Sequence, residues 1–334
     1  MAILVVGGAG YIGSHMVKTL KKNNLEVVIF DNLEKGHIEA VQNTPFHKGD
    51  LRNKDEVAEV FKKHKITAVM HFSAYSLVGE SMEKPEIYYE NNVYGTLNLL
   101  AAMNKAGVTH FIFSSTAATF GEPVKVPIDE NHPQKPTNVY GETKLAVEKM
   151  LDWFEEIYGI KNVKLRYFNA AGADPSGEIG EYHETETHLI PIILQAALGE
   201  RDHITIYGSD YDTKDGTCIR DYIHINDLAD AHLLALKYLE AGNSSTAFNL
   251  GNGSGYSVKE VIDVAKKVTG KEIKVIEGDR RPGDPAVLIA GSQKAKDVLG
   301  WEPELYDIST IIETAWKWHN GTAKEWIKNK NKAV

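Results

Sequence analysis

The sequence predicts an α/β fold, with a doubly wound parallel sheet in its first half and a smaller α/β region after it. Apolar runs alternate with helical patterns from the first residues to about residue 170. A glycine-rich turn joins the first apolar run to the first helical pattern, and the alternation loosens beyond about Ala170. We therefore expect one domain over residues 1–170 and a second region over 171–334, from which the chain returns to the core sheet.

The first turn predicts a dinucleotide site. An apolar strand at 3–6 is followed at once by three glycines with the spacing of a phosphate-binding turn, Gly7, Gly10 and Gly13. Such a turn lets the backbone approach a pyrophosphate at a helix N-terminus. The next strand ends in Asp31, whose carboxylate can accept hydrogen bonds from a ribose and would repel a 2′-phosphate. We therefore expect a Rossmann domain that prefers NAD to NADP.

Further strands and helices follow in alternation. Strands are expected near 46–47, 68–73, 110–115 and 163–167, with helices at 54–64 and 88–106. Ligands of parallel sheets bind beyond the carboxyl ends of the strands. The residues expected at these ends are Gly7, Asp31, Asp50, Phe72, Ser73, Ala74, Ser114, Ser115 and Thr116. They should line one crevice.

Tyr140 and Lys144 form the chain's only Tyr-x-x-x-Lys spacing. On a helix this spacing places the phenol and the ammonium on one face. Lowering a tyrosine pKa from about 10 to about 7 takes roughly 4 kcal/mol, which a lysine and a second cation could supply. About one such spacing is expected by chance in this chain. Its position after a strand ending in Thr116, whose hydroxyl could relay a proton, favours a functional role.

The second half is more irregular. The pattern predicts a long loop at 173–187, a strand at 204–207, helices at 189–198, 226–239, 292–299 and 308–319, and a frayed charged end at 324–334. His183 and His188 lie five residues apart and would not share a helix face, so no metal site is predicted. Arg280 and Arg281 could bind a diphosphate or form a surface salt-bridge cluster, and both readings stay open.

The composition is that of an ordinary globular protein, with 43% apolar and 25% charged residues in 334. The net charge of −9 argues against nucleic acid or an anionic membrane as a partner. The single cysteine, Cys218, suits a reducing compartment. The first residues lack a signal-peptide leader and no apolar run reaches about 18 residues, so we expect a cytoplasmic location.

Six segments together resemble the UDP-glucose 4-epimerases of the extended short-chain dehydrogenase/reductase family. They are VGGAGYIG at 6–13, HFSAYSLVGES at 71–81, FIFSSTAATFG at 111–121, YGETK at 140–144, RYFN at 166–169 and RDYIH at 220–224. The resemblance implies that Tyr140 is the base, that Lys144 binds the nicotinamide ribose and lowers the tyrosine pKa, and that Thr116 replaces the usual serine.

The resemblance also implies two sets of binding residues. The expected NAD contacts are Gly7, Gly10, Tyr11, Ile12, Gly13, Asp31, Asn32, Asp50, Leu51, Phe72, Ser73, Ala74, Asn91, Tyr140, Lys144 and Phe168. The expected contacts to a UDP-hexose are Thr116, Tyr140, Asn169, His188, Leu189, Thr205, Tyr207, Arg220, Arg281, Asp284 and Leu288. Ser76 stands where several relatives have a lysine, and Leu288 where some have a tyrosine.

The implied activity is interconversion of UDP-glucose and UDP-galactose by hydride abstraction at the sugar C4, rotation of the keto sugar and hydride return. The implied assembly is a homodimer built from helices 88–106 and 140–158. Four alternatives remain. The chain could also accept UDP-N-acetylhexosamines, act as a 4,6-dehydratase, work as a simple dehydrogenase that releases NADH, or be a non-catalytic NAD sensor. A dehydratase needs an extra pair of acidic residues after Thr116, where this chain has Ala117 and Ala118, so this alternative is disfavoured. A sensor would have no need of Tyr140, Lys144 and Thr116 together, which argues against a non-catalytic role.

Overall fold

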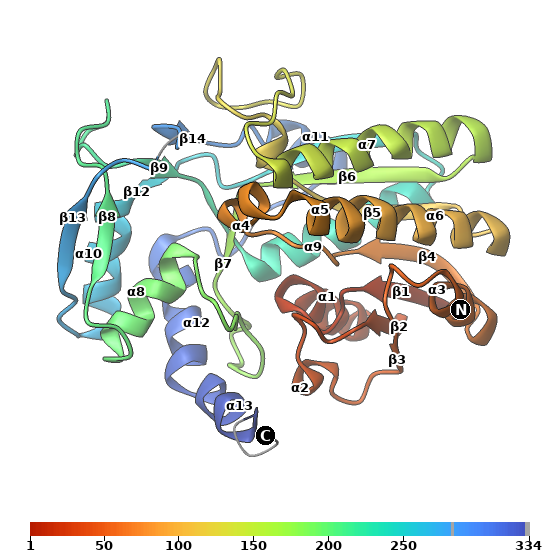
Figure 1. The fold of residues 1–334 in the computed structure, drawn as a ribbon, viewed down its shortest axis with the longest axis horizontal. Helices are drawn as coiled ribbons and strands as arrows, with labels where there is room; N and C mark the ends of the chain where they lie inside the picture. Colours follow the sequence, from red (N-terminus) through yellow and green to blue (C-terminus); the bar gives the residue numbers. More distant parts are fainter. Residues whose placement is uncertain (282–283, 331–334) are drawn as a thin grey trace.

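The computed structural model describes residues 1–281 and 284–330 and is built around one seven-stranded sheet (Figure 1). All neighbouring strands in this sheet are parallel. Their spatial order is β11-β6-β5-β4-β1-β2-β3. The strands are β1 (Ala2–Val6), β2 (Glu26–Asp31), β3 (Phe46–Lys48), β4 (Ile66–His71), β5 (His110–Thr116), β6 (Lys161–Tyr167) and β11 (Thr246–Leu250). The predicted doubly wound fold is confirmed.

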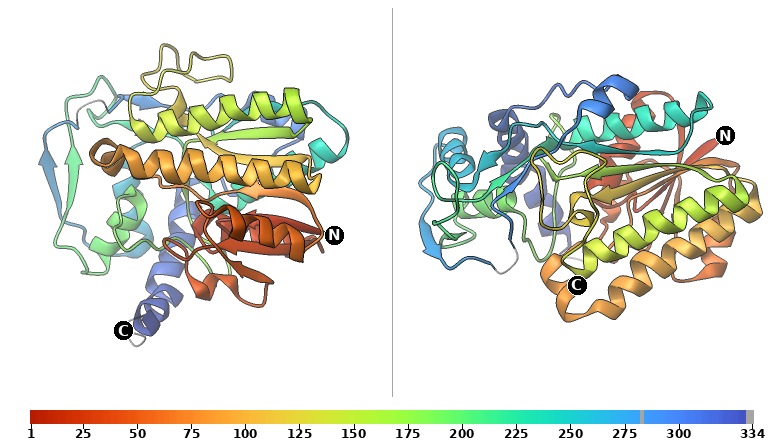
Figure 2. Two further views of the ribbon diagram at one scale, coloured as in Figure 1. Left: turned by 45° about the vertical axis from the view of Figure 1, so that its right-hand side comes forward. Right: turned by 90° about the horizontal axis from the view of Figure 1, so that it is seen from above.

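Helices cover both faces of the sheet, as the view from above shows (Figure 2). One apolar core lies between the sheet and the helices α1 (Tyr11–Lys22), α9 (Ile225–Glu240) and α11 (Gln293–Leu299). The other lies between the sheet and α3 (Lys54–Lys63), α6 (Gly95–Ala106) and α7 (Val139–Tyr158). Because both faces are buried, the strands read as nearly continuous apolar runs in the sequence.

The strand order reverses between β1 and β4, since β1 is followed in the chain by its neighbour β2 on one side, whereas β4 lies on the other side. The connections that leave these two strands turn in opposite directions and open a crevice at their carboxyl ends. Gly7 follows β1 and Phe72 follows β4 at this edge. The fold therefore puts the glycine turn at the usual ligand position of a doubly wound sheet.

The second half of the chain contributes to two places. Strand β11 and helix α9 join the large sheet, which agrees with the expected return of the chain. A separate core holds α8 (Leu189–Ala197), α10 (Val258–Thr269) and α12 (Ile308–Asn320). It is accompanied by three small sheets built from β7 (Asn169–Ala171), β8 (Ile204–Tyr207), β9 (Ile219–Arg220), β10 (Tyr222–His224), β12 (Tyr256–Ser257), β13 (Val275–Gly278) and β14 (Val287–Leu288).

Two sequence predictions about helices need correction. The expected helix at 88–106 is interrupted, because α5 (Pro85–Tyr88) leads into a π-helical turn (Tyr89–Tyr94) before α6 begins. The expected frayed end is helical as far as Lys330, in α13 (Thr322–Lys330), and residues 331–334 lie outside the described part of the chain. Trp326 of α13 packs edge-on against Trp318 of α12, which anchors the last helix.

The remaining helices are short: α2 (Ile38–Val41), α4 (Val78–Glu83) and a 3-10 turn (Ala117–Thr119) directly after β5. Over the described residues, no helix has the length and apolar character needed to cross a bilayer.

Candidate active site

The glycine turn leaves room for a phosphate group at the start of α1. A Cβ on Gly13 would lie 2.1 Å from the Gly7 carbonyl oxygen, and one on Gly7, whose φ is +80°, would lie 2.6 Å from the Ser73 amide nitrogen. A Cβ on Gly10, by contrast, would meet only the Gly7 oxygen at 3.4 Å. No side chain caps α1 at Gly10. Its first amide groups therefore face open space, as binding of a pyrophosphate requires.

Asp31 stands beside this turn at the end of β2. Its two carboxylate oxygens accept hydrogen bonds from the amides of Ala9 (3.0 Å) and Leu33 (2.8 Å). Burial raises the pKa of Asp31, and these two bonds oppose the shift. They fix the carboxylate next to the glycine turn, where a ribose hydroxyl could donate to it. The residues present thus fit an NAD molecule.

The neighbouring strand ends carry a polar chain that reaches β3. Asn32 donates to Asp50 (3.0 Å), and Asp50 is paired with Arg52 at 2.6 Å. Hydrogen bonds from Arg52 lower the pKa of Asp50 to about 2, despite partial burial. Leu51, which follows Asp50, is buried and accepts a hydrogen bond at its carbonyl from Asn98. Sequence reasoning did not single out Arg52, although its place next to Asp50 was the available signal.

The predicted residues after β4 and β6 lie along the same edge of the sheet. Phe72 packs against the ring of His232, with 4.8 Å between centroids. Ser73 and Ala74 follow it in an extended segment, and Phe168 lies between β6 and β7. The exposed Ser76 lies in the same segment after β4.

Asn91 lies in the π-helical turn, where it is 5% exposed and donates to Asn92 at 3.0 Å. Asn92 in turn donates to the Thr143 hydroxyl on α7 at 3.1 Å. π-Helical turns often occur at functional sites. Here the turn joins the predicted cofactor residue Asn91 to the helix of Tyr140.

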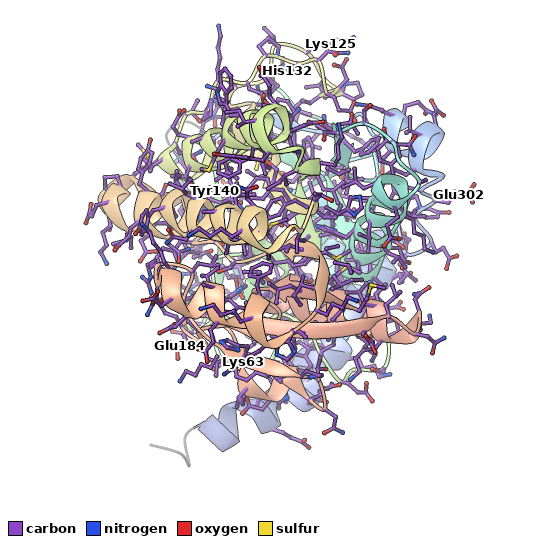
Figure 3. The ribbon with its side chains drawn as sticks, turned by 90° about the vertical axis from the view of Figure 1, so that its right-hand side faces the viewer. Lys63, Lys125, His132, Tyr140, Glu184 and Glu302 are labelled. Atoms are coloured by element: carbon purple, nitrogen blue, oxygen red, sulfur yellow. The ribbon has the colours of Figure 1, made fainter. Side chains whose placement is uncertain are left out.

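Tyr140 (Figure 3) and Lys144 both lie in the first turns of α7, as their spacing predicted. Asn138 caps this helix by accepting a hydrogen bond from the Gly141 amide (2.8 Å). The Tyr140 amide donates to Ser81 Oγ at 3.2 Å. Burial raises the pKa of Tyr140 to about 12, and a hydrogen bond with the Thr116 hydroxyl opposes the shift. Thr116 is thus the group that acts on the phenol in this structure, and the catalytic roles of the two residues stay predictions.

Lys144 points elsewhere than the sequence suggested. Its Nζ donates to the Ser114 carbonyl oxygen at 2.8 Å and lies 4.8 Å from the Phe113 ring centroid. Burial lowers the pKa of Lys144 to about 7, with the charge of Glu148 acting against that shift. The ammonium does not contribute to the pKa of Tyr140 in this arrangement. Its expected effect on the phenol stays a prediction for the cofactor-bound protein.

A buried ion pair supports this region and was missed from the sequence. Glu148 binds Arg166 at 2.6 Å, with the two side chains only 3% and 8% exposed. Glu148 also accepts hydrogen bonds from Ser115 and Gln134. Because Ser115 precedes Thr116, the pair links α7 to the strand end that carries the Thr116 hydroxyl. The spacing of four between Lys144 and Glu148 on one helix was the signal that could have found it.

The predicted substrate residues form two groups in the second half. Arg220 of β9 is paired with Asp284, and Leu288 of β14 lies opposite Arg220 in the ladder. Arg281 stacks on Tyr207 of β8 at 4.0 Å, and Thr205 lies on the same strand. Among the described residues, neither group touches Tyr140 through a hydrogen bond, ion pair or ring contact.

Arg280 and Arg281, which the sequence suggested as either a diphosphate site or a salt-bridge cluster, make different contacts. Arg280 forms a surface ion pair with Asp210 at 2.6 Å. Arg281 forms no ion pair with another described residue, and its binding of a diphosphate stays a prediction. Pro282 and Gly283, which follow, lie outside the described residues.

Asn169 and the RDYIH segment are held together by a second buried acid that sequence reasoning did not identify. Asn169 donates to the Asp221 carbonyl oxygen at 2.9 Å. The Asp221 carboxylate accepts three backbone amides, from Asn252, Gly253 and Ala290, at 2.7–3.0 Å. Asp221 thus ties β10, the loop after β11 and the strand end at Ala290 into one frame. Position within a conspicuous motif was its only sequence signal.

His188 occupies the N-cap position of α8 without a capping hydrogen bond from its side chain, and Leu189 is the first residue of the helix. The Nδ1 of His188 faces the carboxylates of Glu181 (2.8 Å) and Glu186 (3.1 Å). His183 lies in the same irregular segment. The two imidazole rings are 5.4 Å apart in this irregular segment, so the helix-face argument from their spacing does not apply to them.

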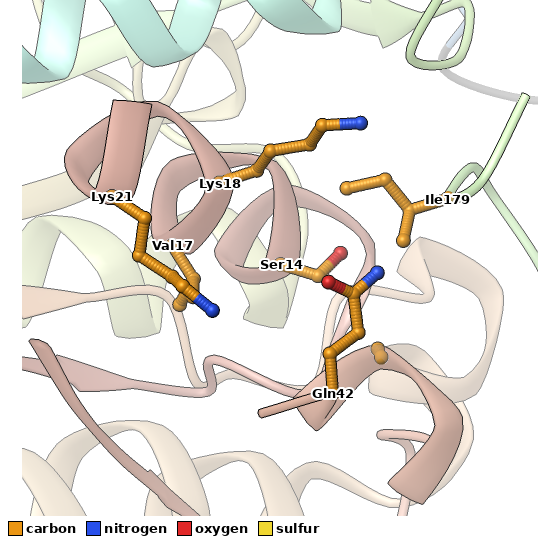
Figure 4. A pocket seen from close by; sticks show the side chains of 7 residues that line it. Ser14, Val17, Lys18, Lys21, Gln42 and Ile179 are labelled. Carbon is orange, nitrogen blue, oxygen red and sulfur yellow. The ribbon is translucent and has the colours of Figure 1, made fainter. Parts of the chain in front are cut away.

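Two cavities lie away from the predicted site. One of about 60 Å³ lies beside α1 and is lined by residues including Ser14, Lys18 and Ile179 (Figure 4). It is too small for a nucleotide, since ligand pockets measure roughly 300–1,000 Å³. The other, about 380 Å³, includes Leu25 and His110 among its lining residues, at the opposite edge of the sheet.

Comparisons with known proteins agree with this geometry. Residues 3–251 match the model of the NAD dependent epimerase/dehydratase family. A UDP-glucose 4-epimerase of Halalkalibacterium halodurans is 56% identical over 319 residues, which cover 96% of each chain. The structure of UDP-glucose 4-epimerase from Brucella ovis in complex with NAD superposes with a TM-score of 0.93 at 46% identity, covering 94% of this chain and 97% of that one.

A further structure, of UDP-glucose 4-epimerase from Bifidobacterium longum in complex with NAD+ and UDP, gives a TM-score of 0.91 at 37% identity and covers 97% of this chain and 99% of that one. The match with the family model spans the part of the chain that holds the glycine turn, Tyr140, Lys144 and the RDYIH segment. The chain therefore belongs to the NAD dependent epimerase/dehydratase family and, within it, to the UDP-glucose 4-epimerases.

Proposed function

We propose that the chain interconverts UDP-glucose and UDP-galactose with bound NAD. The observation that carries the proposal is the partly buried phenol of Tyr140, on whose pKa the Thr116 hydroxyl acts, at the same sheet edge as the glycine turn. A base and a partner hydroxyl at this edge are what removal of a proton from a sugar hydroxyl requires. When bound, NAD supplies a hydride acceptor that returns the hydride, so the reaction has no net redox change.

In the proposed mechanism, Tyr140 takes the proton from the C4 hydroxyl of the hexose and later gives it back. Thr116 holds the same hydroxyl by a hydrogen bond and keeps the phenol oriented. Lys144 is proposed to bind the nicotinamide ribose. Gly7, Gly10 and Asp31 hold the dinucleotide at the start of α1, and Asn91 positions it from the π-helical turn.

The pKa of Tyr140 sets the requirement for this base. A change from about 12 to about 7 corresponds to about 7 kcal/mol, which exceeds the roughly 4 kcal/mol expected for an unperturbed tyrosine. One unit charge about 4 Å away supplies about 4 kcal/mol at an effective dielectric constant near 20. Two cations are therefore needed. We propose that the first is Lys144, whose ammonium would exchange its hydrogen bond to the Ser114 carbonyl for contacts with the ribose and the phenol. The second would be the positive charge of oxidised NAD.

The two groups of substrate residues fit the UDP portion. Arg281 keeps its donors for a diphosphate, and the Arg220–Asp284 pair and Asn169 lie on neighbouring elements. Because these contacts are made far from the reacting carbon, they anchor the nucleotide and leave the keto sugar free to rotate. His188, Leu189, Thr205 and Tyr207 complete the proposed set.

An assay of UDP-galactose conversion by the purified protein tests the proposal. We expect UDP-glucose as product with no net NADH, whereas accumulation of NADH would indicate a dehydrogenase and a 4-keto-6-deoxy sugar a dehydratase. Tyr140→Phe should reduce turnover by about 10²-fold or more and retain bound NAD, measured by absorbance. Tyr158→Phe, at the exposed end of the same helix, is the matched control. Near-normal activity of Tyr140→Phe would contradict the mechanism.

We also propose that the sugar pocket admits N-acetylated hexoses. Leu288 occupies a position where a tyrosine closes the pocket in some relatives, and it lies opposite Arg220 in the ladder. Leucine is the smaller side chain and leaves space for an acetamido group.

The proposed assembly is a homodimer formed through the helices that carry Tyr94 and Tyr140. Large apolar side chains are exposed there, among them Leu97, Trp153, Ile157 and Tyr158. A cytoplasmic location is proposed as well, since the only cysteine, Cys218, is a buried free thiol that suits a reducing compartment. We retain residues 1–170 and 171–334 as the proposed domain division, with β11 and α9 crossing it.

A further inference from the structure

Four potential metal ligands meet in the irregular segment before α8. Glu181, His183, Glu186 and His188 each offer one ligand atom, and these atoms all lie within 4.8 Å of one another. The segment runs between β7 and α8 without helix or strand. The argument that two histidines five apart cannot cooperate therefore does not apply to them.

The contacts alternate between nitrogen and oxygen. Nδ1 of His183 lies 3.5 Å from Glu181 and 3.2 Å from Glu186, and Nδ1 of His188 lies 2.8 Å and 3.1 Å from the same two carboxylates. A tetrahedral zinc site with bonds of about 2.0–2.1 Å has ligand atoms about 3.4 Å apart. The four distances bracket that value. Each Nδ1 also faces two carboxylates, although an imidazole nitrogen has at most one hydrogen to donate.

The two carboxylates of this cluster face histidines but no lysine or arginine among the described residues. The side chains of Glu181 and Glu186 are each only 4% exposed. Within the described part of the chain, no lysine or arginine lies within 4 Å of either carboxylate. Buried carboxylates require a paired positive charge or a metal ion. A further buried atom, Nε2 of His319, has no hydrogen-bond partner among the described residues.

We propose that Glu181, His183, Glu186 and His188 bind one divalent transition-metal cation of the zinc class. Two imidazoles and two carboxylates make four ligands, the number that zinc takes in structural sites. Magnesium and calcium prefer all-oxygen sites, so the pair of imidazole ligands selects against them. Both histidines use Nδ1, which leaves Nε2 of His188 available for the UDP-sugar contact proposed above.

The location gives the metal a structural role. The Glu181 carbonyl accepts a hydrogen bond from Trp318 Nε1 on α12 at 2.8 Å, and the Tyr182 carbonyl lies 3.0 Å from Nε2 of His37, which follows β2. His188 itself is the residue directly before α8, at its N-cap position. A metal bound by this segment would fasten the start of α8, a proposed substrate element, to α12 and to the dinucleotide side of the molecule.

Metal analysis of the untagged full-length protein tests the proposal independently of epimerase activity. The chain is first treated with a chelator and then dialysed against buffered Zn²⁺, and its zinc content is measured by plasma mass spectrometry. The same measurement is made on His183→Gln, Glu186→Gln and Glu184→Gln. Glu184 is an exposed acid of the same segment that lies outside the four-residue cluster, so its variant is the matched control (Figure 3).

We expect about one zinc per chain in the parent and in Glu184→Gln. Binding by His183→Gln and Glu186→Gln should be weaker by about 100-fold or more, since loss of a residue that only supports a ligand already costs about 10–100-fold. Cobalt bound by the parent should give the absorption bands of a tetrahedral ion, and the bands should be lost in both cluster variants. A parent chain that binds no zinc would overturn the proposal, as would equal binding by all four proteins or a preference for Mg²⁺.

Discussion

Replacement of Glu148 by glutamine tests whether the buried ion pair on α7 supports the proposed catalytic helix. Arg166, its partner, is 6% exposed. In Glu148→Gln the arginine keeps its charge but loses the carboxylate. Breaking a buried pair in this way costs about 3–5 kcal/mol, because an uncompensated charge remains inside the protein. Arg166 also donates to the Glu130 carbonyl and lies 5.4 Å from the Phe120 ring, so we expect the lower end, about 3 kcal/mol.

Urea unfolding followed by fluorescence measures this loss. Glu155→Gln is the control, because Glu155 lies on the same helix and pairs with Lys161 at 2.7 Å, with side chains 26% and 45% exposed. An ion pair with that exposure contributes less than about 1 kcal/mol. A loss below about 1 kcal/mol in Glu148→Gln as well would refute the reasoning.

The difference should also depend on pH. Burial raises the pKa of Glu148, but hydrogen bonds and the charge of Arg166 bring it below its ordinary value. For a carboxyl group whose pKa is lower in the folded state, the stabilisation is complete above the unfolded pKa of about 4.3 and is lost as the pH falls through the folded pKa. The parent and Glu148→Gln should therefore converge in stability below about pH 4. A constant difference down to acid unfolding would contradict the electrostatic explanation.

Three further predictions concern Lys144, Leu288 and Trp153. Burial lowers the pKa of Lys144 to about 7 in the folded, cofactor-free protein, so between about pH 7 and pH 10.4 the unfolded state binds one more proton than the folded state. The free energy of unfolding should therefore rise over this range by up to about 1.4 kcal/mol per pH unit relative to Lys144→Met. Parallel pH profiles of the two proteins would exclude a titrating lysine. Wild-type protein should turn over UDP-N-acetylglucosamine as well as UDP-glucose, and Leu288→Tyr should lose the first activity by about 10-fold or more; no turnover of the N-acetylated sugar by the wild type would count against an open pocket. Trp153 is 59% exposed, so Trp153→Glu should leave stability unchanged but convert the dimer to monomers in sedimentation velocity; a variant that remains dimeric would place the interface elsewhere.

Much of the fold could be predicted because its signals are local. The apolar runs of β1, β2 and β4 are nearly continuous, and the glycine turn has a fixed spacing. The π-helical turn had no such signal, since its apolar spacing is close to that of an α-helix. β14 has only two residues, and its pairing with β9 depends on contacts between segments distant in the sequence. No local pattern specifies such pairing.

The candidate site shows the same division. Tyr140, Thr116 and the strand-end residues could be found because each belongs to a motif or ends a strand. The hydrogen bond from Lys144 to the Ser114 carbonyl could not be predicted, because it depends on which rotamer the buried lysine side chain adopts. Glu148 and Asp221 were missed because a buried acid has no signature until its partners are known. The meeting of His183 with His188 was hidden for a similar reason, since it requires an irregular backbone path that spacing alone does not predict.

The return of the chain to the large sheet affects how the protein can fold during synthesis. β11 covers the open edge of β6, and α9 together with Trp301 completes the core on one sheet face. These residues leave the ribosome long after the glycine turn and Tyr140. Until then, the first half would present an unpaired strand edge and an apolar surface, two features that promote aggregation. Completion of the dinucleotide half must therefore wait for the segment 225–301, and a fragment that ends near residue 170 should need a chaperone or a complementing fragment to stay in solution.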